Sequence, residues 1–174
     1  MYKLNGVMYS AEEIKSKVKE LATPVEKAYA GEELLVVGIL KGASVFCADL
    51  IREIDLDVRM DFMVVSSYGS STESSGTVKI IKDLDVDIEN KNVLIVEDII
   101  DSGLTLSSLV AALKTRRPKS LKLCTLLDKP QRRTANIDVD YVGYVIEDKF
   151  IVGYGIDYDE KYRNLPYIGI VEDI

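Results

Sequence analysis

The side chains best suited to chemistry lie in one stretch, residues 93–106, where an apolar run is followed by three acidic residues and a polar turn. The run 93–96 is typical of a buried strand, and Glu97 and Asp98 come at its carboxyl end. Two adjacent carboxylates there offer hard oxygen ligands that suit magnesium or sugar hydroxyls. Asp101 immediately precedes the polar turn, close enough to act on a sugar or base held there.

The turn Ser102-Gly103-Leu104-Thr105 opens directly into a helical pattern. Its backbone amides can converge on a phosphate, helped by the helix dipole. Ser102 and Thr105 add hydroxyl donors, and Gly103 lets the backbone approach the ligand closely. The alternative is that the acids cap the helix and the glycine merely turns the chain. Because three acids, the turn and a helix start coincide at a strand end, we favour a site for a phosphate and a sugar.

The composition excludes several classes of protein. The chain of 174 residues has no histidine, which excludes Ser-His-Asp triads and histidine metal sites and leaves proton transfer to carboxylates, lysine or tyrosine. Its formal net charge of -7 argues against a general binder of nucleic acid or of membrane surfaces. We find neither a signal peptide nor an apolar run long enough to cross a bilayer, and expect a cytoplasmic protein. Cys47 and Cys124 lie in apolar runs and are expected to be buried, reduced thiols.

The elements that position the chemical stretch alternate between strands and helices. Ser10 and Glu13 have the form of a capping box, and the helix that they begin is expected to stop near Gly31. Apolar and amphipathic runs then predict strand 34–37, helix 44–52, a half-buried strand 58–64, strand 92–97, helix 104–115, strand 121–127 and short β pieces within 141–171. This order predicts one α/β domain over residues 1–174, with a mostly parallel sheet flanked by helices. Such sheets bind ligands at the carboxyl ends of their strands.

A serine-rich segment, residues 66–76, lies between two strand-like runs. A hairpin needs far fewer residues, so the excess predicts either a mobile flap over a site or an idle disordered loop. Composition alone supports the two interpretations about equally.

The stretch from Glu97 to Gly103, Glu-Asp-Ile-Ile-Asp-Ser-Gly, closely resembles the phosphoribosyl pyrophosphate signature of the type I phosphoribosyltransferases, in particular the hypoxanthine-guanine branch. Five further segments resemble others of that family in the expected order: Leu40-Lys41-Gly42, Ser67-Tyr68, Leu127-Asp128-Lys129-Pro130, 149–154 and 157–163. Each match is weak when taken alone, since Lys41 or Lys129 could be an ordinary surface lysine and Phe150 a core residue. The ordered co-occurrence makes the resemblance specific. One departure is Leu104, which stands where some relatives carry a lysine.

The resemblance implies transfer of the 5-phosphoribosyl group from phosphoribosyl pyrophosphate to N9 of hypoxanthine or guanine in purine salvage. In that reaction Asp101 would be the general base and Mg²⁺ the metal. The implied metal ligands are Glu97, Asp98 and Asp157, with the two former also near the ribose hydroxyls. The implied pyrophosphate ligands are Lys41, Gly42 and Arg163, and the implied purine contacts are Lys129, Phe150 and Ile151.

The resemblance also implies larger features. Ser67 and Tyr68 would belong to a flexible catalytic loop, about 66–78, that closes over the site. In the family, the pyrophosphate loop that Leu40-Lys41-Gly42 resembles carries a cis peptide before its lysine. A small purine-binding hood would form from the N-terminal segment and residues 149–174. The family further implies a homodimer or homotetramer.

Two other classes of protein remain to be weighed. A regulator that senses phosphoribosyl pyrophosphate could share the fold, but the acidic charge and the full set of catalytic positions argue against it. A phosphate-accepting signalling domain also places acids at strand ends, but it would not need the segments around Lys129, Phe150 and Arg163.

Overall fold

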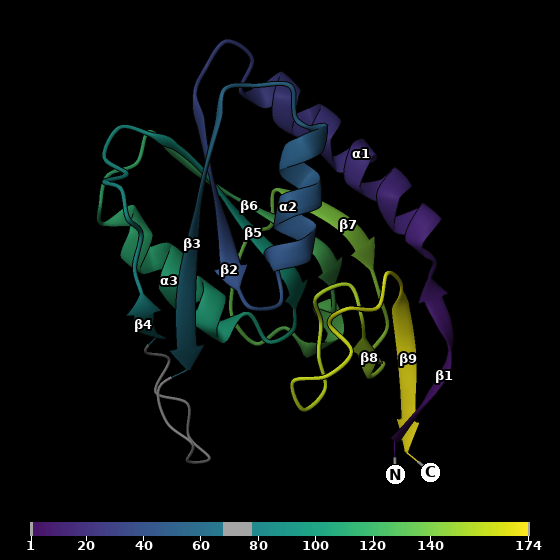
Figure 1. The fold of residues 1–174 in the computed structure, drawn as a ribbon. Helices are drawn as coiled ribbons and strands as arrows, with labels where there is room; N and C mark the ends of the chain where they lie inside the picture. The colour runs from purple at the N-terminus through teal and green to yellow at the C-terminus, as the bar shows by residue number, and fades with distance from the viewer. Residues whose placement is uncertain (1, 68–77, 174) are drawn as a thin grey trace.

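The computed structural model describes residues 2–67 and 78–173, which form two sheets and their flanking helices (Figure 1). The larger sheet has the strand order β4-β3-β2-β5-β6-β7, and the smaller has the order β1-β9-β8. The larger sheet consists of β2 (Leu34–Leu40), β3 (Val58–Ser67), β4 (Val78–Lys82), β5 (Asn92–Ile100), β6 (Ser120–Asp128) and β7 (Tyr141–Val145). All its neighbours are parallel except β3 and β4. The predicted α/β fold with a mostly parallel central sheet is therefore confirmed.

The central strands are apolar along almost their whole length because helices cover both faces of the sheet. Helices α1 (Ala11–Ala28) and α2 (Ser44–Glu53) pack on one face, and α3 (Leu104–Lys114) packs on the other (Figure 1). Phe46 and Leu50 of α2 and Leu109 of α3 are fully buried. Burying each such side chain contributes roughly 1.5–3 kcal/mol, so the strands and helices hold one another in place.

Local signals explain where the first helix begins. The Ser10 hydroxyl accepts a hydrogen bond from the Glu13 amide at 3.3 Å, and the Glu13 carboxylate accepts one from the Ser10 amide at 2.8 Å. This confirms the capping box, a device worth about 1 kcal/mol. The helix ends at Ala28, earlier than the stop expected at Gly31, because Tyr29 already has non-helical dihedral angles and caps the last turn.

The smaller sheet joins the two ends of the chain. Strand β1 (Tyr2–Tyr9) pairs antiparallel with β9 (Ile168–Asp173), which pairs with the short β8 (Ile151–Val152). Figure 1 shows β1 and β9 side by side, with both termini at the same corner. The sequence did not predict β1, because Gly6 has a positive φ and the register with β9 shifts twice, so no regular alternation marks the strand.

In the sequence of β3, the apolar Val58, Met60, Phe62 and Val64 alternate with Arg59 and Asp61, which predicts that the apolar set is buried, and this is wrong at two positions. Met60 is exposed, whereas Asp61 is buried. The Asp61 carboxylate accepts hydrogen bonds from the amides of Phe62 and Asp85, at 2.7 and 2.8 Å, and pairs with Lys82. These partners compensate the burial of its charge, so a charged residue can face the interior here.

Among the helices of the described residues, none combines the length and the apolar composition needed to cross a membrane.

Candidate active site

Several predicted site residues directly follow strands at one edge of the central sheet. Strands β2, β5 and β6 are parallel neighbours, so the segments that follow them meet at their carboxyl ends. Lys41 and Gly42 follow β2, Asp101 follows β5, and Lys129 follows β6. The Leu40–Lys41 peptide bond is cis, as the family resemblance implies.

The two adjacent acids lie inside strand β5, not at its end. The strand continues to Ile100, three residues beyond the end expected at Glu97. The pairing of β5 with β2 reaches only Val96, while its pairing with β6 continues to Ile100. Glu97 and Asp98 therefore lie where the sheet has lost one neighbour and a ligand can approach.

Close backbone packing brings the Lys41 loop to this acidic pair. A Cβ atom added to Gly42 would lie 1.8 Å from a carboxylate oxygen of Asp98, so only glycine leaves room for that side chain. A Cβ atom added to Gly155 would likewise lie 2.1 Å from the carbonyl oxygen of Gly42. Gly155 also has a φ of +96°, which glycine adopts without strain. Three chain segments thus meet at glycines.

The pKa values of both acids, Glu97 and Asp98, are raised in the structure. Burial raises the pKa of the Glu97 carboxyl well above its usual range, and the charge of Asp98 raises it further. Burial also raises the pKa of Asp98, although hydrogen bonds from Glu97 and from the Ile99 amide oppose this effect. A cation or a pair of sugar hydroxyls would relieve the mutual repulsion of the two groups.

The polar turn has the form of an anion site. Gly103 is the N-cap of α3 with a φ of +75°, and no side-chain hydrogen bond caps this helix end. Ser102, Gly103, Leu104 and Thr105 line a cavity of about 180 Å³ together with Glu97 and Asp101. The structure thus gathers the whole predicted turn and two of the three acids around one hollow. The amides of the first helical turn have no acceptor within the helix and can bind a ligand there, although the Leu104 amide donates to the Ser102 hydroxyl at 3.4 Å.

Residues 133–135, for which the sequence predicted no role, are hydrogen-bonded to the polar turn. The amides of Thr134 and Ala135 both donate to the carbonyl oxygen of Ser102 at 3.0 Å. The Arg133 side chain donates from Nε to the carbonyl oxygen of Asp101 at 3.2 Å and pairs with the Asp128 carboxylate. No sequence motif marks Arg133, which is one of two adjacent arginines in a polar stretch.

Lys129 and Asp101 form an ion pair at the carboxyl ends of β5 and β6. Lys129 is only 5% exposed, and its ammonium donates to the carbonyl oxygen of Lys149 at 2.7 Å. It also lies 3.5 Å from Asp148 and 3.7 Å from Asp101. The Asp101 side chain is 50% exposed and open to a ligand, whereas only 7% of the Lys129 side chain is exposed.

The predicted purine contacts differ from each other in burial. Phe150 is an exposed aromatic residue, and its ring meets Tyr158 edge to face at a centroid distance of 5.2 Å. Its neighbour Ile151 is buried in β8. Phe150 follows Lys149, whose carbonyl oxygen holds the Lys129 ammonium, so its ring belongs to the same part of the site.

Arg163 and Asp157 form a second charged group. Their side chains pair at 2.8 Å, and Arg163 also donates to the carbonyl oxygen of Gly155 at 2.8 Å. The buried Nε of Arg163 has no hydrogen-bond partner within the described residues. Glu160, which the sequence analysis did not single out, pairs with both Lys41 and Arg163.

The described residues do not show two of the predicted features, the cluster of metal ligands and the catalytic loop. Within residues 2–67 and 78–173, no three or more acidic, cysteine or histidine side chains are arranged to hold a metal ion. Ser67 ends strand β3, and Tyr68 with most of the predicted catalytic loop lies outside the described residues. Both cysteines are buried free thiols, as expected.

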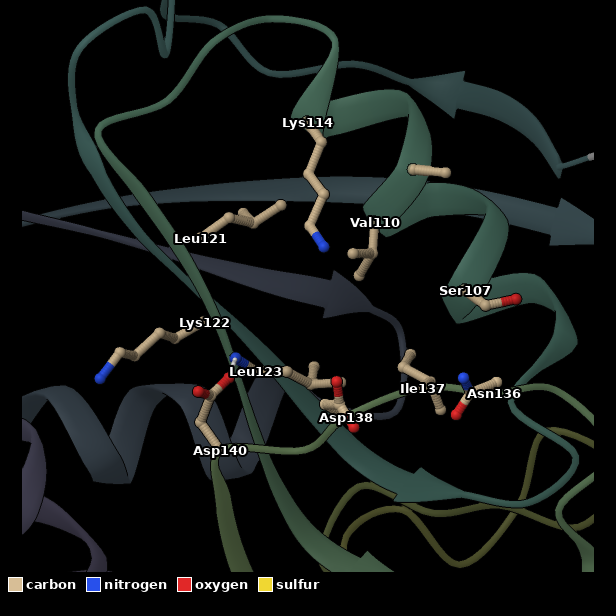
Figure 2. Close-up of a pocket in the computed structure, with 11 residues that line it drawn as sticks. Ser107, Val110, Lys114, Leu121, Lys122, Leu123, Asn136, Ile137, Asp138 and Asp140 are labelled. Atoms are coloured by element: carbon tan, nitrogen blue, oxygen red, sulfur yellow. Dashed lines mark hydrogen bonds between the residues drawn. The ribbon is translucent and has the colours of Figure 1, made fainter.

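The structure has another cavity, away from these residues, between α3 and the segment before β7 (Figure 2). Its volume is about 420 Å³, and Figure 2 shows the Lys114 ammonium pointing into it, with Val110 and Ile137 on its walls. None of the predicted site residues lines it. Of the predicted site residues, Glu97, Asp101 and the turn Ser102-Gly103-Leu104-Thr105 line the smaller hollow at the sheet edge instead.

A parallel α/β sheet with an uncapped helix start, adjacent acids and an exposed aspartate beside a buried lysine is an arrangement that suits a ligand carrying phosphate and sugar groups. Residues 8–159 match the phosphoribosyl transferase domain family, and the chain belongs to that family. The hypoxanthine-guanine phosphoribosyltransferase of Bacillus subtilis (strain 168) is 56% identical over 169 residues, covering 97% of this chain and 94% of the relative.

Solved structures agree with this assignment. A hypoxanthine-guanine phosphoribosyltransferase from Bacillus anthracis superposes with a TM-score of 0.93 at 52% identity, covering 99% of this chain and 100% of that one. A hypoxanthine phosphoribosyltransferase from Staphylococcus aureus gives a TM-score of 0.94 at 53% identity, covering 97% and 92% of the two chains.

Proposed function

We propose that this protein transfers the 5-phosphoribosyl group from phosphoribosyl pyrophosphate to hypoxanthine or guanine, giving IMP or GMP and pyrophosphate. The observation that carries the proposal is the pairing of Lys129 with Asp101 beside the anion-binding turn. A buried ammonium can donate to a 6-oxo group, and a nearby carboxylate can accept a ring proton. The relatives named above act on the same class of base, so the alternative of a ligand-sensing regulator has no support.

The turn and the acids would hold the sugar phosphate. The amides of residues 102–105 would bind the 5-phosphate at the start of α3. Glu97 and Asp98 would accept hydrogen bonds from the ribose hydroxyls. Lys41, the Gly42 amide and Arg163 would bind the pyrophosphate oxygens and stabilise the negative charge that grows on the leaving group.

The reaction would be a displacement at the anomeric carbon. N9 of the purine forms the new bond as the bond from that carbon to pyrophosphate breaks, through a transition state with oxocarbenium character. The proton on N7 passes to Asp101. Phe150 would stack on the purine ring, Ile151 would contact it, and Lys129 would hold its 6-oxo group. Ser67 and Tyr68 would belong to a loop that excludes water from the closed site.

The side chains fit a magnesium ion that arrives with the substrate. Glu97, Asp98 and Asp157 are hard oxygen donors, and burial raises the pKa values of the first two, an effect that a bound cation would oppose. Mg²⁺ commonly takes only one or two carboxylates and completes its shell with phosphate oxygens and water. This agrees with the lack of a three-acid cage among the described residues. When bound, the ion would neutralise charge on the departing pyrophosphate.

Turnover measurements test the proposal. We expect Mg²⁺-dependent formation of IMP and GMP from phosphoribosyl pyrophosphate, release of pyrophosphate and no comparable product from adenine. A parallel assay of binding to RNA and DNA tests the regulator alternative. Nucleic-acid binding that responds to phosphoribosyl pyrophosphate, without turnover of either base, would contradict the proposal. We also propose a cytoplasmic homodimer or homotetramer with a purine-binding hood formed by β1, β8 and β9, as the family resemblance implies.

A further inference from the structure

One carboxylate lies between the two side-chain cations assigned to the pyrophosphate. Oε2 of Glu160 is 2.8 Å from Nζ of Lys41, and Oε1 of the same carboxylate is 3.4 Å from Arg163. Lys41 and Arg163 come from distant parts of the chain, after β2 and before β9, and the Glu160 carboxylate is an ion-pair partner of both.

The backbone presents Glu160 in an unusual way. Tyr158 and Lys161 exchange both backbone hydrogen bonds, at 3.2 and 3.0 Å, and so close a two-residue turn. The central residues Asp159 and Glu160 have φ values of +52° and +61°. Positive φ at both positions is a feature of type I′ turns, which favour asparagine, aspartate or glycine there. Glutamate in the second position is strained, and it is the residue whose side chain reaches the two cations.

The turn is also tied to the rest of the site. The Glu160 amide donates to Oδ2 of Asp157 at 2.9 Å, and Oδ1 of Asp157 pairs with Arg163 at 2.8 Å. The Glu160 side chain itself is 66% exposed, and Lys41 is 67% exposed. The carboxylate can therefore leave the cations for solvent without moving the backbone, because exposed ion pairs are weakly held.

We infer that Glu160 is an internal stand-in for the pyrophosphate group. Its carboxylate occupies Lys41 and Arg163 while the site is empty, and the pyrophosphate must displace it on binding. Competition of this kind weakens the hold on pyrophosphate and eases its departure as a product. The inference rests on the proposed function, which assigns Lys41 and Arg163 to the leaving group.

The test is calorimetric titration of the protein with inorganic pyrophosphate in the presence of Mg²⁺. Removing a competing carboxylate with two exposed contacts should lower the dissociation constant by about 2- to 10-fold in Glu160→Gln, given how weakly such pairs are coupled. Glu160→Gly, which also relieves the positive φ, should bind at least as tightly. The KM for phosphoribosyl pyrophosphate should fall in the same variants.

Asp159→Asn is the matched control. It removes the same charge one residue away, but Asp159 is 77% exposed and pairs with Lys161 at 3.7 Å, not with Lys41 or Arg163. Its dissociation constant should stay near that of the unmodified protein. Equal tightening in Asp159→Asn and Glu160→Gln would mean that net charge alone acts, and would overturn the inference.

A third variant separates this inference from the proposed function. Lys41→Ala should weaken pyrophosphate binding if Lys41 has its assigned role. If it does so while Glu160→Gln leaves binding unchanged or weaker, the stand-in role of Glu160 is wrong and the proposed function stands. If Lys41→Ala leaves pyrophosphate binding unchanged, the assignment of Lys41 in the proposed function is wrong and the inference falls with it.

Discussion

Replacing Lys129 with methionine should weaken the preference for 6-oxopurines over adenine. The ammonium is a donor with no acceptor capacity, and it is held by the Lys149 carbonyl oxygen at 2.7 Å in a buried position. Methionine keeps the apolar stem and removes only the charged donor. Asp148 and Asp101, the two carboxylates nearby, are about half exposed, so water can replace their partner and the fold should persist.

The magnitude follows from the type of hydrogen bond that is lost. A bond to a charged group contributes about 1.5–3 kcal/mol, so kcat/KM for hypoxanthine should fall by roughly 10- to 150-fold in Lys129→Met. With adenine, the unmodified protein would set the 6-amino donor against the buried ammonium, and neither donor would gain an acceptor from the other. Discrimination of that kind reaches roughly 10⁴-fold, so adenine should give negligible turnover.

The assay compares kcat/KM for hypoxanthine, guanine and adenine in the unmodified protein and the variant. Lys149→Ala is the control, because it keeps the carbonyl oxygen that holds Lys129 and changes only a half-exposed neighbouring lysine. The control should retain the preference, whereas Lys129→Met should narrow the gap between hypoxanthine and adenine. Efficient use of adenine by the unmodified protein, or an unchanged ratio in the variant, would refute the role of Lys129.

Three further predictions concern other parts of the site and the core. Asp101→Asn should lower kcat by roughly 10²- to 10⁴-fold, as loss of a positioned base does, with little change in the KM for phosphoribosyl pyrophosphate; unaltered kcat would make Asp101 structural. Gly103→Ala should reduce stability by at least about 1–2 kcal/mol in urea unfolding, because φ is +75° and the new Cβ would lie 3.0 Å from the Arg133 side chain; an unchanged midpoint would contradict this. Burial raises the pKa of the Cys47 thiol to about 12, so at pH 8 a disulfide reagent should label it only after unfolding; rapid labelling of the native protein would refute the burial argument.

Local patterns predicted the parts of the fold that local physics decides. The capping box at Ser10 satisfies its own amides, and the apolar run before Glu97 needs burial on both faces, so each carries its signal within a few residues. The failures have causes outside the local window. Asp61 is buried because partners from the neighbouring loop and strand neutralise it, and β1 exists because β9 offers it an edge.

The candidate site shows the same division. Asp101 and Lys129 are recognisable one by one, but the sequence does not state that they touch. Their contact follows from register, because Ile100 pairs with Asp128 at the ends of β5 and β6, and the first residue after each strand is then a neighbour of the other. The Lys129 amide also donates to the carbonyl oxygen of Ile100 at 3.0 Å, and this hydrogen bond holds the backbone of Lys129 beside the end of β5.

A slip of one residue between these strands would turn the lysine to the opposite face, since successive side chains alternate. The acid and the donor proposed for catalysis are therefore positioned by the fully buried core of two strands, in which Leu127, Cys124 and Val96 leave no freedom of register. Glu160 lies at the other extreme. Its place between two cations depends on a turn with positive φ and on contacts between chain segments that are distant in sequence, and nothing in the local sequence announces it. Core burial fixes the groups that must meet the base, whereas an exposed turn carries the one group that must move aside.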